Sequence, residues 1–580
     1  MDRSVDRSVD RPVDRPVDRA VDRAVDRAVD RYGRRRFLRS GALAAAGAAS
    51  AAFLGCSASP GRGSRSATTA PATSTTETLD AAAWAQLSAS LRVPLVLPSS
   101  PAYATARLVY DPRFDDARPA AIALCTSAAD VQRCVEFART HGIAPIPRCG
   151  GHSYGGYSTG AGLVIDVTPM HDVVVTGAGS AGGAGNTGGG AGIGGSRSAP
   201  GATAVVGAGT LLVDLYDQLS QAGVLVPGGS CPTVGISGLA LGGGVGVVGR
   251  KYGLTCDAIE SVRIVTADGR ALTCDAGTHE DLYWACRGGG GGNFGVVTSF
   301  TFAAAPIPEL ALFTLDWPSS AAADVLGAWL AWQHGAPEEL WSNCQLQSAS
   351  GGAMGVRTAG MLVGSATSLA SLVAGLVAAV GTQPTYRFVG PEQYLHAMLV
   401  EAGCEGLDVA QCRLVGQSPT GTLHGVASVA SSAYVSVLPP PAGVDAFVQS
   451  VDDLGRTLPG FGGGLVFDAY GGAINAVKPG DTAFVHRDAL CGIQASVATG
   501  ASASAVAQGR SWLAHLASTV APYVDGSAYQ NYIDPTLSDW QRAYYGDNLG
   551  RLVSVKAAYD PDDVFHFAQS VPTRLTTPGR

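Results

Sequence analysis

Two glycine-rich stretches decide the fold of this chain: PRCGGHSYGGYSTG at residues 147–160 and GGSCPTVGISGLALGGGVGVVG at residues 228–249. Each stretch carries one side chain that can act as a nucleophile, His152 in the first and Cys231 in the second. Glycine has no Cβ atom, so its backbone can approach another group closely. We therefore expect the two stretches to line one ligand site, with His152 and Cys231 facing the ligand.

Length and composition set the broad class of the protein. A chain of 580 residues is too long for one ordinary core, so two domains are expected after any leader. Hydrophobic residues make up 46% and charged residues only 15%, which is typical of a globular protein. The net charge of -8 argues against nucleic acid as a partner, because a basic face is needed to neutralise phosphates.

The cysteines and histidines do not form a metal-binding pattern. The chain has 12 cysteines without a C-x-x-C pair, and its 10 histidines form no H-x-H or H-E-x-x-H group. A zinc or iron–sulfur site is therefore not expected. Disulfides are possible if the protein is exported, and Cys404 with Cys412 is the first pair to test; the alternative is two unrelated buried thiols.

The N-terminal segment has features of export rather than of a fold. Residues 1–32 repeat a tetrapeptide, from MDRS to VDRY, with one apolar residue in four. This pattern predicts either a disordered segment or a translation start that was assigned too far upstream. Residues 33–56 hold an Arg-Arg-x-Phe-Leu order and then a short apolar run, which resembles a twin-arginine signal. Phe53–Cys56 resembles a lipobox. We expect export to a secreted or cell-surface form, with membrane attachment only through a lipid on Cys56, and a flexible tether over 57–83.

The remaining chain predicts two α+β domains. Residues 84–305 form the first, residues 306–530 the second, and residues 531–571 return to the first as a C-terminal segment. Predicted helices cover 127–142, 211–222, 320–334 and 366–380, and predicted strands cover 143–146, 162–167, 203–208, 433–438 and 465–470, with a hairpin over 259–274. Residues 177–201 are almost all Gly, Ala and Ser and predict a surface insertion.

A Rossmann dinucleotide site is the first alternative that the sequence offers. Residues 244–249 match G-x-G-x-x-G. However, Arg250-Lys251-Tyr252-Gly253 interrupts the helix that should receive the pyrophosphate, and the next segment is a hairpin. The Rossmann interpretation is therefore disfavoured.

The motifs together resemble a known family. R-x-G-G-H-S, G-x-C-x-x-V-G-x-x-G-x-x-x-G-G-G-x-G and W-A-x-R-G-G-G-G-G-N-F-G-V-V-T occur in that order, and Y-x-N-Y-x-D with Y-Y-G-x-N-x-x-R-L-x-x-V-K-x-x-Y-D-P-x-x-V-F follows over 529–565. This combination resembles the berberine bridge enzyme-like branch of the FAD-linked oxidases over roughly residues 100–570. The resemblance implies a two-domain α+β flavoprotein: a PCMH-type FAD-binding domain, similar to that of vanillyl-alcohol oxidase, and a substrate domain with an antiparallel sheet covered by helices.

The resemblance also implies how FAD is held. His152 would bond to the flavin 8α-methyl group and Cys231 to C6, giving a bicovalent cofactor with a raised reduction potential. Val234, three residues after the cysteine, matches the position where valine accompanies oxidases that pass electrons to O2. The other residues implied to bind the cofactor are Arg148, Gly150, Gly151, Ser153, Gly235, Gly238, Gly242, Gly243, Asn293, Gly295, Val297, Asn531 and Asn548.

Catalysis requires a base that accepts a proton from the substrate. Tyr532 matches the family's catalytic tyrosine, and a phenol with its ordinary pKa needs a partner. Asp468 and Tyr470 share a face of their predicted strand by alternation, so one of them is expected to be that partner. Gln494 stands where plant alkaloid-forming members carry a glutamate, which disfavours alkaloid ring closure.

The resulting expectation is an FAD-dependent oxidase. It would oxidise an alcohol or hemiacetal of a sugar, oligosaccharide or glycosylated metabolite and reduce O2 to H2O2. Two alternatives remain open at this point. One is a dehydrogenase with a different electron acceptor, and the other is a surface lipoprotein that keeps the flavin fold without turnover.

Overall fold

A computed structural model describes residues 81–177 and 202–575, which all belong to one unit of the chain. Several predicted segments lie outside the described residues: the repeat, the signal with its lipobox, nearly all of the tether, and nearly all of the 177–201 insertion. The first described helix, α3 (Ala81–Ser90), begins three residues before the expected start of the fold at residue 84. Among the described residues, no helix combines the length and apolar character that membrane crossing requires.

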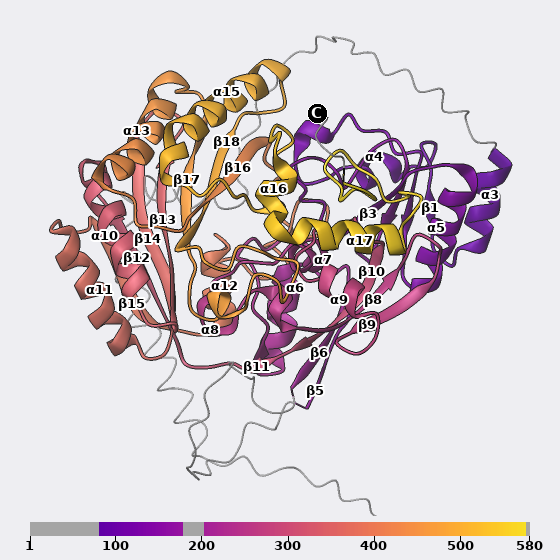
Figure 1. Cartoon of the computed structure of the whole chain (residues 1–580), viewed down its shortest axis with the longest axis horizontal. Coiled ribbons are helices and arrows are strands. Elements are labelled where there is room, and N and C mark those ends of the chain that lie inside the picture. The colour runs from indigo at the N-terminus through magenta and orange to yellow at the C-terminus, as the bar shows by residue number, and fades with distance from the viewer. Residues whose placement is uncertain (1–80, 178–201, 576–580) are drawn as a thin grey trace, which may run out of the picture. The chain divides into compact units, whose positions relative to one another are not determined.

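The first part of the chain contains a small, largely parallel sheet (Figure 1). Its strands have the order β1-β2-β4-β3, in which β2 and β3 both pair with β4 in parallel. The helix α5 contacts β3 and β4 of this sheet and β8 of the next one. Its elements are β1 (Leu95–Val96), α4 (Tyr103–Ala106), β2 (Ala121–Leu124), α5 (Ala128–His141), β3 (Pro145–Arg148) and β4 (Leu163–Asp166).

The predicted ends of α5 are confirmed. Ser127 is its N-cap: the Ser127 hydroxyl accepts a hydrogen bond from the Asp130 amide and donates one to the Asp130 carboxylate at 2.7 Å. Gly142 ends the helix with a φ of 64°, in the left-handed region that glycine adopts readily. The chain then continues through β3 directly into the first glycine-rich stretch.

A second, antiparallel sheet has the strand order β5-β6-β10-β8-β9. It includes the predicted hairpin, formed by β8 and β9. Thr176 and Thr203 are register partners in the β5–β6 pair, so the predicted insertion leaves and returns at adjacent points. β7 (Val224–Leu225) and β11 (Ala305–Pro306) pair with each other in a separate two-stranded sheet. The other elements of this part of the chain are β5 (Val173–Thr176), β6 (Thr203–Gly207), α6 (Leu212–Gln221), α7 (Ile236–Leu241), α8 (Gly249–Tyr252), β8 (Ile259–Val265), β9 (Ala271–Asp275), α9 (Glu280–Ala285) and β10 (Val296–Ala303).

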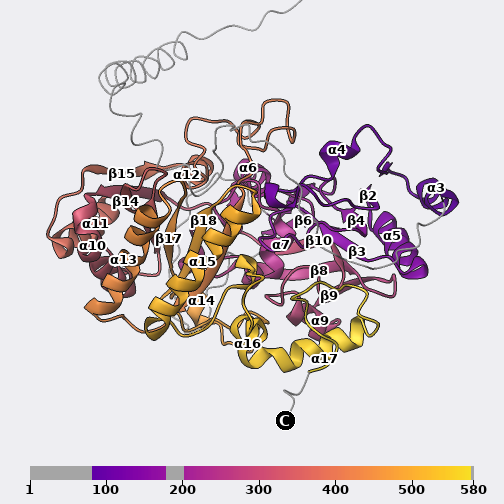
Figure 2. The same ribbon diagram turned by 90° about the horizontal axis from the view of Figure 1, so that it is seen from above.

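The third sheet has seven antiparallel strands in the order β15-β12-β14-β13-β17-β18-β16. Helices α10, α11, α13 and α15 lie along one of its faces (Figure 2). The elements are β12 (Leu310–Trp317), α10 (Ala322–Gly335), β13 (Leu340–Ser348), β14 (Met354–Val363), α11 (Ala366–Val380), β15 (Tyr386–Glu392), α12 (Tyr394–Glu401), β16 (Ser428–Val435), α13 (Pro441–Thr457), β17 (Gly462–Ala469), α14 (Ala473–Ala476), β18 (Cys491–Ala498) and α15 (Ala503–Val520).

The two faces of this sheet differ in polarity. Phe467 on β17 points to the helical face, where its ring packs against Trp329 of α10 and Phe447 of α13. Because side chains alternate along a strand, Asp468 belongs to the opposite face, together with its register partner Asn343 on β13. The sheet therefore presents polar groups on the face that the four helices leave uncovered.

The predicted strand at 433–438 needs a correction. The strand β16 begins earlier, at Ser428, and ends at Val435. Pro439, Pro440 and Pro441 follow shortly afterwards and have no N–H group to donate to a sheet. The predicted Cys404–Cys412 pair is confirmed as a disulfide.

The end of the chain returns to the first part, where α17 (Leu549–Tyr559) contacts α9 (Figure 1). A short helix, α16 (Trp540–Tyr545), precedes it. Lys556 is completely buried, and its ammonium group donates hydrogen bonds to the Asn293 and Phe565 carbonyl oxygens and to the Asp560 carboxylate. A paired buried charge of this kind fixes the C-terminal segment against the Asn293 turn.

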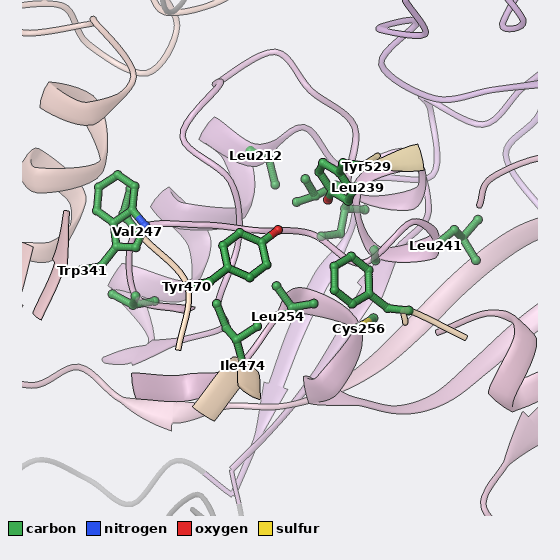
Figure 3. Packing of buried hydrophobic residues seen from close by; sticks show 14 of the residues in the cluster. Leu212, Leu239, Leu241, Val247, Leu254, Cys256, Trp341, Tyr470, Ile474 and Tyr529 are labelled. Atoms are coloured by element: carbon green, nitrogen blue, oxygen red, sulfur yellow. The ribbon is translucent and has the colours of Figure 1, made fainter. Parts of the chain in front are cut away.

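One hydrophobic core connects these parts. Figure 3 shows Tyr470, Ile474 and Trp341 beside Val247 and Leu254, which belong to the second glycine-rich stretch and the segment after it. The sheet that carries Trp341, and Tyr470 just beyond the end of β17, are thereby held against the glycine-rich stretch that carries Cys231.

Candidate active site

The two glycine-rich stretches meet at Gly150 and Gly235. An added Cβ atom at Gly150 would collide with the backbone of Gly235, and one at Gly235 would collide with Gly150 and with the Cys149 side chain. Only glycine permits this approach of one backbone to the other. This contact agrees with the expectation that the two stretches lie together in the fold.

Thr233 lies between the two predicted attachment residues. Its hydroxyl oxygen is 2.8 Å from Nε2 of His152, and the same threonine is completely buried. The Thr233 amide and hydroxyl also lower the pKa of the Cys231 thiol. Thr233 was not among the predicted site residues. In the sequence, only its position inside the motif around Cys231 points to a role for it.

The environment keeps both attachment residues uncharged near neutral pH. Burial lowers the pKa of His152 to about 3, so its imidazole is neutral, and the Tyr110 ring stacks on it at 3.9 Å between ring centroids. Burial raises the pKa of the Cys231 thiol, an effect that Thr233 and the Val234 amide partly offset. The imidazole is therefore ready to act as a nucleophile, whereas the thiol must first lose a proton.

Arg148 offers a buried donor. Its guanidinium pairs with Asp166 at 2.8 Å and donates to the Ala106 carbonyl oxygen at 2.7 Å, while Nη1 is buried without a partner among the described residues. Near the second stretch, an added Cβ atom at Gly238 would meet nothing within 4 Å. The unpartnered Nη1 of Arg148 is a cationic donor, and Gly238 has open space beside it. Both features fit an anionic dinucleotide such as FAD.

The three asparagines predicted to bind the cofactor make their hydrogen bonds with the protein. The side-chain amide groups of Asn293, Asn531 and Asn548 donate to the carbonyl oxygens of Gly289 at 3.0 Å, Leu239 at 3.0 Å and Pro479 at 2.7 Å, respectively. These bonds hold the glycine turns and the C-terminal segment in place. Direct contact of the three side chains with FAD stays a prediction.

The other predicted cofactor residues lie on the same segments, and their roles also stay predictions. The Gly151 carbonyl accepts a hydrogen bond from the Tyr110 amide, and the Ser153 hydroxyl accepts one from the Tyr157 amide. Added Cβ atoms would collide with Asn531 at Gly242, with Phe484 at Gly243 and with Val265 at Gly295. Val297 pairs with Ile264 in the second sheet, and Val234 is half-buried.

Tyr532 lies in a cluster of aromatic side chains. Its ring stacks on Tyr154 with 5.8 Å between centroids and meets the edge of Tyr529 at 4.9 Å. The Tyr529 hydroxyl is engaged elsewhere, since it accepts hydrogen bonds from the Gly244 amide and the Asn531 side chain, both at 2.8 Å. The cluster therefore joins the C-terminal segment to both glycine-rich stretches.

The two predicted partners of Tyr532 have different surroundings. Burial raises the pKa of Tyr532 well above its ordinary value, and Asp468 is the next cause. The Asp468 side chain makes no hydrogen bond with the described residues, and burial raises its pKa to about 7. Tyr470, in contrast, lies beyond the end of β17 and its hydroxyl is 3.2 Å from that of Tyr434. Both Asp468 and Tyr470 act electrostatically on Tyr532, and which of them is its partner stays a prediction.

Gln494 and Tyr154 form a pair that the sequence analysis did not anticipate. The Gln494 amide donates a hydrogen bond to the Tyr154 hydroxyl at 2.6 Å. Tyr154 follows His152 by two residues, and Gln494 lies on β18 on the polar face of the large sheet. This bond joins the first glycine-rich stretch to the face that carries Asp468.

Two family models match the chain. The model described as FAD binding domain matches residues 119–275, and the model described as berberine and berberine like matches residues 528–572. The first covers both glycine-rich stretches, and the second covers Tyr532 and the C-terminal segment. These matches support FAD as the cofactor of the site.

Individual relatives match most of the chain. The structure of Physcomitrella patens BBE-like 1 is 32% identical, with a TM-score of 0.74, over 85% of this chain and 99% of that one. The uncharacterized FAD-linked oxidoreductase YgaK of Bacillus subtilis (strain 168) is 29% identical over 80% of this chain and 95% of its own length. A chitooligosaccharide oxidase of Gibberella zeae is 28% identical over 78% of this chain and 87% of its own length.

Proposed function

This chain belongs to the berberine bridge enzyme-like family of FAD-linked oxidoreductases, and from that premise we propose that it oxidises an alcohol or hemiacetal carbon of a carbohydrate and passes the electrons to O2. The observation that carries the proposal is the stack of Tyr532 on Tyr154, a residue of the first glycine-rich stretch, together with the electrostatic effect of Asp468 on Tyr532. A chitooligosaccharide oxidase among the relatives supports a carbohydrate substrate. A glycosylated metabolite would present the same chemical group.

The proton of the substrate hydroxyl is taken up by Tyr532 and Asp468. Tyr532 has a pKa well above its ordinary value, so its phenol can relay a proton but is a poor final acceptor. Burial raises the pKa of Asp468 to about 7, so its carboxylate can hold that proton near neutral pH. No hydrogen bond joins the two side chains in the described structure, so the substrate hydroxyl or a water molecule must complete the relay.

FAD, when bound, supplies the acceptor for the hydride from the substrate carbon. Arg148 would hold an anionic part of FAD through its free Nη1, and Gly238 would leave room for it. Val234 lies three residues after Cys231 and has a small side chain, which supports access of O2 to the site. Oxidation of an alcohol with transfer of both electrons to O2 yields a carbonyl product and H2O2.

We also propose that FAD is bonded to both His152 and Cys231. The support is the contact between Gly150 and Gly235, which brings the two stretches together, and the neutral state of His152. Thr233 occupies Nε2 of His152, so Nδ1 is the ring nitrogen left to form the bond. Cys231 must lose its proton during this assembly, because burial raises its pKa.

For the location of the protein we propose export through the twin-arginine-like segment, followed by secretion or lipid attachment at Cys56. The Cys404–Cys412 disulfide supports an oxidising compartment. Detection of the mature protein outside the cytoplasm, and mass analysis of its N-terminus, would test both steps. Retention in the cytoplasm would contradict the proposal.

The experiment that tests the activity is anaerobic reduction of the purified protein. D-glucose, cellobiose, xylobiose and N,N′-diacetylchitobiose are added in turn, and we expect at least one to bleach the flavin absorbance. Readmission of air should restore the colour and release H2O2. Dye reduction without H2O2 would instead identify a dehydrogenase, and a flavin that none of these sugars bleaches would contradict carbohydrate oxidation.

A further inference from the structure

Tyr110 covers one face of the His152 ring. The two rings are stacked, with 3.9 Å between their centroids and 21° between their planes. The backbone of Tyr110 is also tied to the first glycine-rich stretch, because its amide donates a hydrogen bond to the Gly151 carbonyl oxygen at 3.2 Å. Tyr110 precedes both glycine-rich stretches in the sequence, and the proposed reaction does not use it.

The stack and one hydrogen bond together fix the orientation of the His152 ring. A histidine side chain turns about two bonds, and the second of these torsions is broad when nothing restrains it. The Tyr110 ring fixes the plane of the imidazole, and the Thr233 hydroxyl, 2.8 Å from Nε2, fixes the rotation within that plane. With both contacts in place, Nδ1 points in one direction, which favours attack on a carbon atom held beside it.

A distant segment packs against Tyr110. This segment, residues 402–425, follows α12 and is here called the disulfide loop, because it contains the Cys404–Cys412 disulfide. Both cysteines are completely buried and belong to a small apolar cluster against which Tyr110 packs. The backbones are close as well, since a Cβ atom added at Gly425 would collide with the Tyr110 carbonyl oxygen. The disulfide loop therefore supports the residue that stacks on His152.

The disulfide loop has an anchor of its own on α6. Arg413 of the loop pairs with Asp214 of α6, and α6 lies beside α12, the helix from which the loop emerges (Figure 1). The next residue toward the start of α6 contacts the cysteine motif, because the Val213 amide donates to the Pro232 carbonyl oxygen at 3.0 Å. Tyr110 is thus held by a loop that is fixed to the same helix as the motif around Cys231.

We propose that Tyr110 is a positioning residue for the attachment of FAD: its ring, held by the disulfide loop, fixes the His152 imidazole so that Nδ1 can bond to the flavin. This inference rests on the proposed bond between His152 and FAD. In the bonding step, His152 replaces one hydrogen of a flavin methyl group, so a C–H bond breaks and a C–N bond forms. The methyl hydrogen and the imidazole N–H hydrogen leave as protons, and O2 accepts both of them with the two electrons of the broken C–H bond, giving H2O2.

The test follows covalent attachment in two backgrounds that separate the two proposed bonds. In Cys231→Ala only the His152 bond can form, and in His152→Ala only the Cys231 bond can form. Full-length protein, purified after a short induction, is incubated with excess FAD under air. The flavin retained by acid-precipitated polypeptide is then measured over time, for each background with Tyr110, Tyr110→Leu or Tyr110→Phe.

The expected loss is confined to the His152 bond. An aromatic pair corresponds to roughly a two- to tenfold preference for one arrangement. We therefore expect Y110L to slow the His152 bond by about that factor, and Y110F, which keeps a ring at this position, to restore the rate. The Cys231 bond should form at the same rate in all three proteins, which also shows that Y110L is folded.

Three results would overturn the role of Tyr110. Equal slowing of both bonds by Y110L would indicate a general structural role. An unchanged His152 bond in Y110L would show that the stack does not matter for attachment. A Y110F protein as slow as Y110L would assign the effect to the tyrosine hydroxyl rather than to the stacked ring.

Gly425→Ala tests the part played by the disulfide loop. Its methyl group collides with the Tyr110 backbone, so it should slow the His152 bond and add nothing to the loss in Y110L, because both changes act through one contact. Gly550→Ala is the matched control at an exposed glycine, where an added Cβ atom meets nothing within 4 Å, and it should change neither bond. An unchanged rate in G425A, or a loss that adds to that of Y110L, would overturn the role of the loop.

The parent variants distinguish this inference from the proposal on which it rests. If Cys231→Ala with Tyr110 intact retains no flavin after acid precipitation, the proposed bond between His152 and FAD fails and the inference falls with it. If that bond forms at the same rate with and without the ring of Tyr110, the bond stands and only the inference is refuted.

Discussion

Thr233 joins His152 to Cys231, because its hydroxyl lies 2.8 Å from Nε2 of His152 while its amide and hydroxyl lower the pKa of the cysteine thiol. One buried side chain thus sets the orientation of the imidazole and moderates the acidity of the thiol. The two residues are 79 positions apart in sequence, and the contact of Gly150 with Gly235 brings their stretches together.

Replacing Thr233 by valine should reduce covalent attachment of FAD. The valine cannot hydrogen-bond to Nε2, so the ring is free to present either nitrogen, and the thiol loses the threonine hydroxyl as one of the groups that lower its pKa. The fraction of flavin that stays with acid-precipitated polypeptide measures the effect. Thr233→Ser keeps the hydroxyl and should restore most of the attachment; a T233V protein with full attachment would contradict the role of Thr233.

Removing both attachment residues should release the cofactor. In the wild type, the yellow colour is expected to remain with the polypeptide after acid precipitation. In the double variant His152→Ala and Cys231→Ala, it should appear in the supernatant, and each single variant should retain one bond. Free flavin recovered from the wild type would refute bicovalent attachment.

Asp468→Asn should reduce turnover by roughly a hundred- to ten-thousandfold, the range in which a general base contributes. Because only the ionised carboxylate accepts a proton, wild-type kcat/KM should rise with pH through about 7, where burial places the pKa of Asp468. The variant should lack this rise. A variant that keeps both the rate and the pH profile would exclude Asp468 as the proton acceptor.

The stability of the same variant provides an independent control. The pKa of Asp468 is raised from 3.8 in the unfolded chain to about 7, so ionisation costs folding free energy as pH rises through this interval. Asparagine carries no such cost. D468N should therefore unfold at a higher temperature than the wild type at pH 8 and at the same temperature near pH 4, which calorimetry can measure.

A matched pair of glycines tests the cofactor site. Alanine at Gly238 meets no atom within 4 Å and lies in α7, so Gly238→Ala should leave the apoprotein as stable or slightly more stable. Its methyl group should nevertheless reduce FAD incorporation. Gly235→Ala collides with Cys149 and Gly150 and should destabilise the fold itself. Normal FAD content in G238A would show that this glycine does not face the cofactor.

The sequence alone determined the parts of the site that depend on local pattern. The glycine spacing predicted both turns, the family motifs pointed to His152, Cys231 and Tyr532, and alternation placed Asp468 and Tyr470 on one face of a strand. Caps and periodicity likewise predicted α5 and the β8–β9 hairpin. Each of these inferences concerns residues that are neighbours in the chain, where backbone geometry translates directly into sequence period.

Only the tertiary structure decided which distant side chains meet. Gln494 donates to Tyr154 across 340 positions, and Asn343 lies opposite Asp468 because β13 pairs with β17. Nothing in a local pattern marks Tyr110 as stacked on His152 or Tyr470 as already bonded to Tyr434. The physical reason is that strand order and register determine which side chains meet on the face of a sheet, and a local sequence pattern specifies neither of them.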